Sequence, residues 1–211
     1  GTEDLGGGLK AIYGISGFLR ADAGLQGRFN GDEGWRRYSF VGLQGSFGTL
    51  RMGRITTASF VHALRFNAFA DSTTFGPYML HLYTGGQPVA APLNAPDSAA
   101  DQSVAYQSPT VGGFSASAQY SFGEVAGQNG RNRWIVGANW SSGPLALSAT
   151  AERSTVTAGL PSGVTRLQNM QLAGSYNFGP AKLTLAHSDS ELSLAAGSRD
   201  LATWQVGTVI P

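Results

Sequence analysis

The sequence contains no cysteine and little charge of either sign, and these absences exclude several classes of protein. Its 211 residues include 14 Lys and Arg against 13 Asp and Glu, so charged residues make up only 13%. Without cysteine, neither disulfides nor zinc sites built on thiolates can form. A net charge of +1 argues against a nucleic-acid binder, which concentrates basic residues on one face. An aromatic content of 10% argues against a disordered chain.

Long hydrophobic runs are also absent. No stretch approaches the roughly 18 consecutive apolar residues that a membrane-spanning helix requires. Gly1 is followed by no charged leader and apolar run, so we expect no signal peptide in this chain. A membrane β-barrel remains compatible with both absences, because a barrel strand carries only a weak, alternating signal.

The pattern that is present is an alternation of apolar and polar residues with a period of two. In the clearest segment, the apolar residues are Phe114, Ala116, Ala118, Tyr120 and Phe122, and the polar ones are Ser115, Ser117, Gln119 and Ser121. Similar alternation recurs over residues 9–20, 133–140, 145–152 and 169–178. Each segment predicts a strand with one apolar and one polar face. We expect about ten such strands.

The two faces differ in a way that favours a membrane barrel over a soluble β-sandwich, which is the competing interpretation. The apolar face has small residues in the middle and aromatic residues at the ends, as at Trp134 and Trp140. Aromatic residues so placed are typical of the belts at the two membrane interfaces. The polar face consists mainly of Ser, Thr, Asn, Gln and Gly, which suit the wall of a water-filled pore.

The connections between the predicted strands alternate in length. Short turns are expected at residues 4–8, 45–48, 108–113, 141–144 and 177–180, and longer polar links near 21–35, 55–101, 123–132, 154–166 and 189–199. Short turns at one end and long loops at the other are typical of an up-and-down transmembrane barrel. The sequence therefore predicts an all-β fold, a transmembrane antiparallel up-and-down β-barrel.

Three motifs, in this order, resemble general porins of Gram-negative bacteria, especially those of the β-proteobacterial branch. They are EDLGGGLKA at residues 3–11, RYSFVGLQGSFGTLRMGR at residues 37–54 and SVAYQSP at residues 103–109. The resemblance implies a porin barrel of about 16 strands, of which this chain would be the central part, lacking the first and last strands. A smaller barrel, complete in itself, is the alternative.

The resemblance also implies a function. A general diffusion porin passes small hydrophilic solutes and ions passively through the outer membrane, has no cofactor, metal site or catalytic residue, and forms a homotrimer in the lipid bilayer. A substrate-specific channel of the same fold would use the loop aromatics Phe66, Phe69, Phe75, Tyr78 and Tyr83. A soluble or surface-exposed all-β binding module is the alternative from another class.

In this family the third loop folds into the barrel and narrows it opposite basic residues on the wall. The counterpart here is the segment 55–101. The expected constriction residues are Arg37, Arg51, Arg54, Asp71, Asp97 and Asp101. Alternation places Arg37 on the face of Ser39, whereas Arg54 shares the face of Leu50 and Met52 unless a bulge intervenes. Because the loop has few acids and Ala105 replaces an arginine of many relatives, we expect a mild preference for anions.

We expect the three histidines to form neither a metal site nor a catalytic triad. His62, His81 and His187 are far apart in the sequence, with no second ligand at metal-binding spacing. The run His187-Ser188-Asp189 contains the residue types of a hydrolase triad, as in outer-membrane enzymes that are small barrels. Neighbouring residues on a strand point to opposite faces, so we expect no triad there.

Overall fold

The computed structural model describes residues 1–27, 34–69, 76, 98–123, 132–155, 164–194 and 196–210. The strands are β1 (Thr2–Gly6), β2 (Leu9–Ser16), β3 (Leu19–Arg20), β4 (Leu25–Gln26), β5 (Tyr38–Gly45), β6 (Gly48–Thr56), β7 (Ala99–Gln107), β8 (Phe114–Ser121), β9 (Arg133–Ser142), β10 (Leu145–Thr155), β11 (Val164–Asn177), β12 (Lys182–Leu194) and β13 (Gly197–Val209). A single helix among the described residues, α1 (Ala58–Phe66), lies between β6 and β7.

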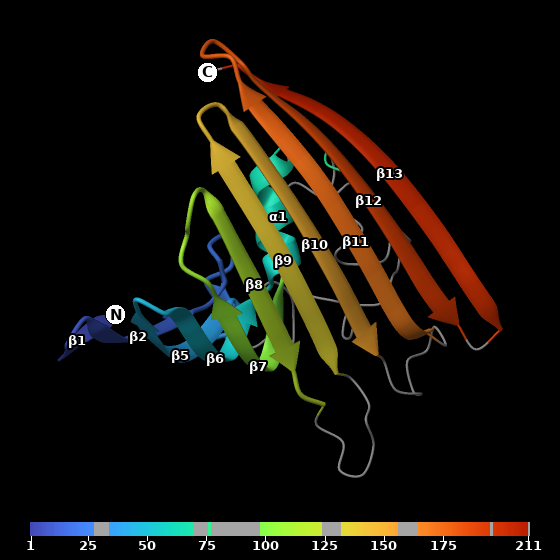
Figure 1. Cartoon of the computed structure of the whole chain (residues 1–211). Helices are drawn as coiled ribbons and strands as arrows, with labels where there is room; N and C mark the ends of the chain where they lie inside the picture. The colour runs from blue at the N-terminus through green and yellow to red at the C-terminus, as the bar shows by residue number, and fades with distance from the viewer. Residues whose placement is uncertain are drawn as a thin grey trace.

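Eleven of the strands form one antiparallel sheet in the order β1-β2-β5-β6-β7-β8-β9-β10-β11-β12-β13. Apart from the hairpin β3–β4, which forms its own small sheet, each strand pairs with its neighbour in the chain. The predicted all-β, antiparallel up-and-down arrangement is therefore confirmed. Figure 1 shows a strongly curved sheet, and no pairing between described residues joins its edge strands β1 and β13.

The short turns lie at one end of the strands. Figure 1 shows the turns β7–β8, β9–β10 and β11–β12 along the same edge of the sheet, at the upper left. In the β1–β2 turn, Gly6, Gly7 and Gly8 all have positive φ, a conformation that favours glycine. The segment 57–98 connects the other ends of β6 and β7 and contains α1.

One predicted loop is wrong. The polar stretch 189–199 is not a long link, because β12 continues to Leu194 and β13 begins at Gly197. Asp189 and Glu191 were expected in the loop, but they are strand residues paired with Ala202 and Asp200. Glu191 lies near the far end of β12, a strand of 13 residues that exceeds the roughly 9–11 that cross a bilayer. Asp189 lies among apolar partners, Met170 and Ala202, and its carboxylate contacts His187.

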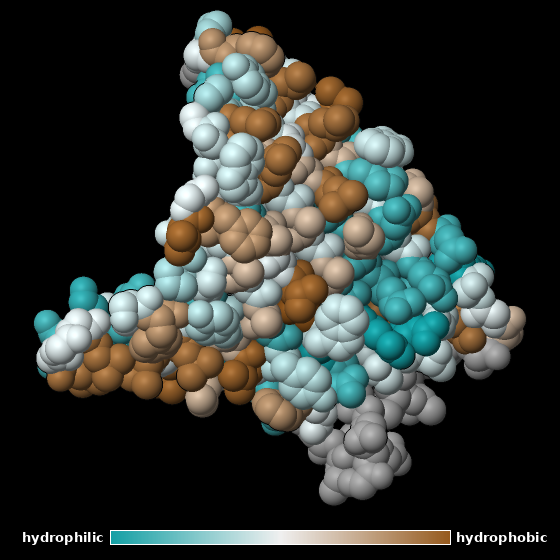
Figure 2. Space-filling view, viewed as in Figure 1, coloured by the Kyte–Doolittle hydropathy of each residue, from teal (hydrophilic) through white to brown (hydrophobic). Residues whose placement is uncertain are grey.

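The sheet is polar on the face that is buried and apolar on the face that is exposed, the reverse of a soluble protein. Gln171 and Ser188 are fully buried, whereas Trp204 and Val206 are 69% and 70% exposed. Figure 2 shows apolar residues along much of the exposed face. Among the described residues, no helix is long and apolar enough to span a membrane.

Cross-strand pairs of aromatic residues stand at both ends of the apolar face of β8 and β9. Phe114 pairs with Trp140 near the short turns, and Tyr120 pairs with Trp134 at the other end. Between them lie smaller partners, including Ala116 opposite Ala138. Because paired residues point to the same face, these pairs form the two aromatic borders that the alternation predicts.

The reversed faces generate a prediction that depends on depth in the membrane. Leu185 and Ser193 lie on the same strand and face of β12, but Leu185 is within the apolar rows and Ser193 is near the far end. Replacing Leu185 by Arg in the full-length protein should lower the free energy of unfolding from lipid vesicles by about 2–4 kcal/mol. The matched Ser193→Arg variant should lose about 0–1 kcal/mol. Equal losses, measured by urea titration with tryptophan fluorescence, would contradict a lipid-facing sheet.

Candidate functional site

The helix α1 packs on the polar face of the sheet, against β8 to β12 (Figure 1). Thr57 caps its N-terminus, since the Thr57 hydroxyl accepts a hydrogen bond from the Phe60 amide at 3.2 Å. At its C-terminus, the Asn67 amide donates to the Ala63 carbonyl at 2.9 Å. The buried residues of the helix are Ser59, His62, Ala63 and Phe66, a spacing that places them on one side. The other side faces away from the sheet.

The N-terminal turn of α1 contacts a buried ion pair on the wall. The Ser59 hydroxyl donates to Glu152 Oε2. Arg133 donates from Nε to Glu152 Oε1 at 2.6 Å, and its Nη2 lies 2.6 Å from the same oxygen. Glu152 is 3% exposed and Arg133 7% exposed. The carboxylate thus joins strands β9 and β10 to the helix.

One turn further along, His62 contacts a pair of polar wall residues. Its Nδ1 lies 2.6 Å from Ser148 Oγ, and Ser148 donates to Asn139 Oδ1 at 2.8 Å. Because the hydroxyl proton of Ser148 is committed to Asn139, Nδ1 of His62 carries the proton in the contact with Ser148. Burial, and to a smaller extent the charge of Arg65, lower the pKa of His62 to about 4. His62 is therefore uncharged at pH 7.

The C-terminal half of the helix is held by apolar contacts. Ala63 and Phe66 form a buried cluster with Ala173 and Ala186 of the wall. Just beyond the helix, Gln205 of β13 donates from Nε2 to Asn67 Oδ1 at 3.1 Å. The helix is thus attached at both ends to the polar face of the sheet.

Of the predicted constriction residues, Arg51 lies on the same face as the helix. It pairs with Gly42 on one side and with Ala105 on the other. Its guanidinium lies 5.7 Å from the centre of the Phe40 ring. No carboxylate in the described part of the chain forms an ion pair with Arg51.

Arg54 and Asp101 meet at a bulge between β6 and β7. Gly53 pairs with Ser103 and Ile55 with Ala100, so Asp101 and Gln102 both lie opposite Arg54. The extra residue of this bulge lies on β7, so Arg54 keeps its place in the alternation of β6 and pairs with Ser39. Arg54 donates to Asp101 Oδ1 at 2.8 Å and to the Arg36 carbonyl at 2.6 Å. Arg36 Nη1 also reaches Asp101 Oδ2, at 3.3 Å. The three form one charge network.

Arg37 lies in a bend just before β5 and is exposed, 6.0 Å from the Tyr38 ring centre. Within β5, Ser39 pairs with Ile15, which belongs to the exposed apolar face. The polar face assigned to Ser39 from the alternation is therefore wrong, because the polar residue lies in an otherwise apolar row. Asp71 and Asp97 lie outside the described residues. The constriction role of all six residues stays a prediction.

Sequence reasoning missed the helix and the charges around it. Arg65 is exposed on the side of α1 that faces away from the wall, 5.5 Å from the Phe66 ring centre. Arg133 and Glu152 lie on adjacent strands, where their pairing could not be distinguished from ordinary surface charge. The helix itself had a signal in the capping Thr57 and the spacing of its buried residues.

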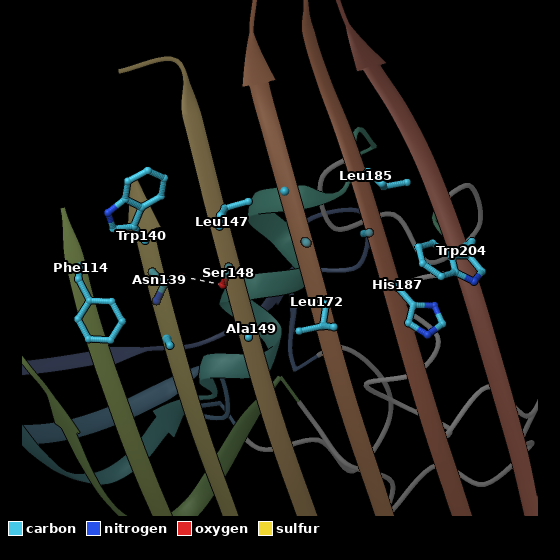
Figure 3. A pocket seen from close by; sticks show the side chains of 14 residues that line it. Phe114, Asn139, Trp140, Leu147, Ser148, Ala149, Leu172, Leu185, His187 and Trp204 are labelled. Atoms are coloured by element: carbon cyan, nitrogen blue, oxygen red, sulfur yellow. Dashed lines mark hydrogen bonds between the residues drawn. The ribbon is translucent and has the colours of Figure 1, made fainter. Parts of the chain in front are cut away.

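The concave surface in Figure 3 is a separate feature on the opposite face. It is a groove of about 450 Å³ whose lining includes Phe114, Trp140, Leu147, Leu172, Leu185 and Trp204. These side chains project from the side of the sheet away from α1. The groove is therefore part of the apolar outer face and not of the polar site.

The residues His187, Ser188 and Asp189 do not converge. His187 stacks on Trp204 with ring centres 4.1 Å apart, and its Nε2 lies 2.8 Å from Asp189 Oδ2. Ser188 is fully buried on the opposite, polar face, where its hydroxyl accepts a hydrogen bond from Asn169. The predicted opposite orientation of His187 and Ser188 is confirmed. In the described part of the chain, no group of three or more His, Asp and Glu is placed to hold a metal ion.

The chain matches a known protein family and several of its members. The family model described as Gram-negative porin matches residues 1–211. Outer membrane porin protein 32 of Delftia acidovorans is 35% identical over 191 residues, which are 87% of this chain and 51% of that protein. Major outer membrane protein P.IB of Neisseria meningitidis serogroup B is 29% identical over 99% of this chain and 58% of its own length.

Solved structures of outer-membrane proteins share the fold of this chain. The anion-selective porin from Comamonas acidovorans superimposes with a TM-score of 0.81 at 27% identity, over all of this chain and 62% of that one. A loop-deletion mutant of OmpT from Vibrio cholerae gives a TM-score of 0.72 at 18% identity, which shows the shared fold alone. The chain spans about half the length of the curated relatives it matches. It belongs to the family of Gram-negative porins, proteins of the outer membrane.

Proposed function

We propose that the protein, at its full length, forms a water-filled pore through which small hydrophilic solutes and ions diffuse passively. The observation that carries the proposal is the reversed sheet, polar on the face that holds α1 and apolar on the exposed face. Such a sheet separates water from lipid, and a closed barrel of this type encloses an aqueous channel. Membership of the porin family points to a channel rather than an enzyme.

The segment 55–101 is proposed to narrow this pore. The packing of α1 on the polar face supports that role, since a helix there occupies space that would otherwise be lumen. Phe66 is fully buried between helix and wall, which favours packing of the loop over a solute site for this aromatic. We further propose a homotrimer in the lipid bilayer, the assembly that resemblance to the family implies.

The pore is proposed to prefer anions. The carboxylates of Asp101 and Glu152 are already paired with Arg54 and Arg133. Arg51 on the wall and Arg65 on the helix form no ion pair with another described residue. The sequence of α1 contains no acidic residue. Uncompensated positive charge in a confined channel attracts anions. The related porin from Comamonas acidovorans is itself described as anion-selective.

Removing either of these arginines tests this preference. In planar bilayers with a potassium chloride gradient, Arg51→Gln and Arg65→Gln should each lower the chloride-to-potassium permeability ratio about two- to fourfold. A charge at about 5–8 Å from the ion path shifts the energies of chloride and potassium in opposite directions, and screening by salt reduces the combined effect to about this factor. Arg51→Lys should retain the ratio because it keeps the charge. Arg166→Gln, on the outer face beside Glu191, is the matched control. Unchanged reversal potentials in both test variants would refute the anion preference.

The low pKa of His62 generates a second prediction. The pKa of about 4 lies below the ordinary value of 6.5. Between these pH values, His62 is therefore more often protonated when the helix is detached than when the helix packs on the wall. The attachment of α1 is therefore fully present above pH 6.5 and weakens as the pH falls toward 4. Single-channel records should become noisier, with more closures, over that window. His62→Gln keeps a donor for Ser148 without a titrating ring and should remove the His62-dependent change. A wild-type channel that is equally quiet at pH 7 and pH 4 contradicts this.

A further inference from the structure

Glu152 is the one carboxylate on the described polar wall that contacts the helix. It lies in a continuous row of paired residues on the polar face, between Ile135 and Asn169. Its neighbours along β10 on the same face, Thr150 and Ser154, are small and uncharged. A hydroxyl at this position would satisfy the needs of a polar wall. A buried carboxylate is costly unless it is paired and fully hydrogen-bonded, so its presence calls for a specific partner.

That partner includes the start of α1. Ser59 is the second residue of the helix, and its hydroxyl donates to Glu152. The helix has no acidic residue in its own first turn. Its N-terminus carries unpaired amide groups and a partial positive charge, which a nearby carboxylate stabilises. Glu152 therefore supplies from the wall the negative charge that the helix sequence lacks.

The same carboxylate forms an ion pair with an arginine on the wall. Both contacts of the Arg133 guanidinium with Glu152 involve Oε1, while Ser59 uses Oε2. Each oxygen of Glu152 thus has a separate function, one toward the wall and one toward the helix. Loss of the negative charge would remove the contact with the helix and the ion pair with Arg133 at the same time.

We propose that Glu152 is a positioning residue that holds the N-terminus of α1 against the pore wall and neutralises Arg133. The inference rests on the proposed pore function, because only in a pore does the position of the helix set the width of a passage. The anchors at His62 and Phe66 fix the middle and C-terminal parts of the helix. Glu152 fixes the end at which the loop leaves strand β6.

The first test measures the position of the helix without using conduction. Residues 1–211 contain no cysteine, so Val61→Cys on the exposed side of α1 accepts a single spin label once any cysteine in the rest of the protein is replaced. The label is compared in the full-length protein with and without Glu152→Gln, in lipid vesicles. The expected result is a more mobile label when Glu152 is replaced. The matched control is Glu191→Gln, the same chemical change on the outer face, where Glu191 pairs with Arg166 and accepts from Gln168. It should leave the label unchanged.

The second test measures the change of charge on the wall. Glu152→Gln should raise the chloride-to-potassium permeability ratio about two- to fourfold, since the wall loses one negative charge at about 5–8 Å from the ion path, screened by salt. The double variant Arg133→Gln/Glu152→Gln restores the charge balance and should return the ratio to the wild-type value, while the Val61 label stays mobile. A merely structural role would not separate the two readouts in this way.

Ser59→Ala keeps the test decisive if the wall variants fail to fold, because it changes only the helix side of the contact. It should mobilise the Val61 label and leave the permeability ratio unaltered. An immobile label in Ser59→Ala and in every folded Glu152 variant overturns the proposal. A mobile label in a protein that conducts no ions supports the positioning role and refutes the pore function instead, so the two failures are distinguishable.

Discussion

The constraint on which the structure depends is that one sheet must face lipid on one side and water on the other. In lipid, every backbone amide and carbonyl needs a partner within the protein, and antiparallel neighbours supply them. One row of paired residues on the polar face runs from Gly42 through Arg51, Gln119 and Glu152 to Leu201. Because pairing fixes the register, side-chain alternation then assigns every second residue to lipid. The apolar band and the polar wall follow from that single geometry.

The same constraint explains why α1 is hard to find in the sequence. An amphipathic helix on a soluble core shows an apolar stripe, but this helix is seated on a wall of hydroxyls and amides. Two of its four buried residues, Ser59 and His62, are therefore polar, and only Ala63 and Phe66 carry the usual signal. A stripe that is half polar resembles a loop. The capping Thr57 is a signal for the helix, but its half-polar stripe is recognised as a buried side only when the surface that receives it is known.

Alternation predicted the fold class and the assignment of faces well, since a period of two follows directly from strand geometry. It failed at positions where the polarity of a residue does not match the face of the sheet to which its side chain points. Ser39 is polar, yet its pairing with Ile15 places it on the apolar face. Asp189 and Glu191 resemble loop residues, yet both belong to β12, and Asp189 lies between apolar partners. Opposite Arg54, the period of strand β7 is interrupted by the extra residue of the bulge. Residue type predicts on average which face of the sheet a side chain lies on, whereas the strand register determines that face at each position.

Charges are the least predictable part of the site for a related reason. The electrostatic field of an arginine depends on whether a carboxylate reaches it, and that depends on contacts between distant segments. Arg54 and Asp101 are separated by 47 residues and form an ion pair 2.8 Å long. Arg51 and Glu152 share a row on the wall but are four strands apart, about 19 Å at the usual strand spacing. Glu152 therefore forms an ion pair with Arg133 but is too far from Arg51 to neutralise its charge. The field in the lumen is thus set by the geometry of pairing rather than by the net charge of the sequence.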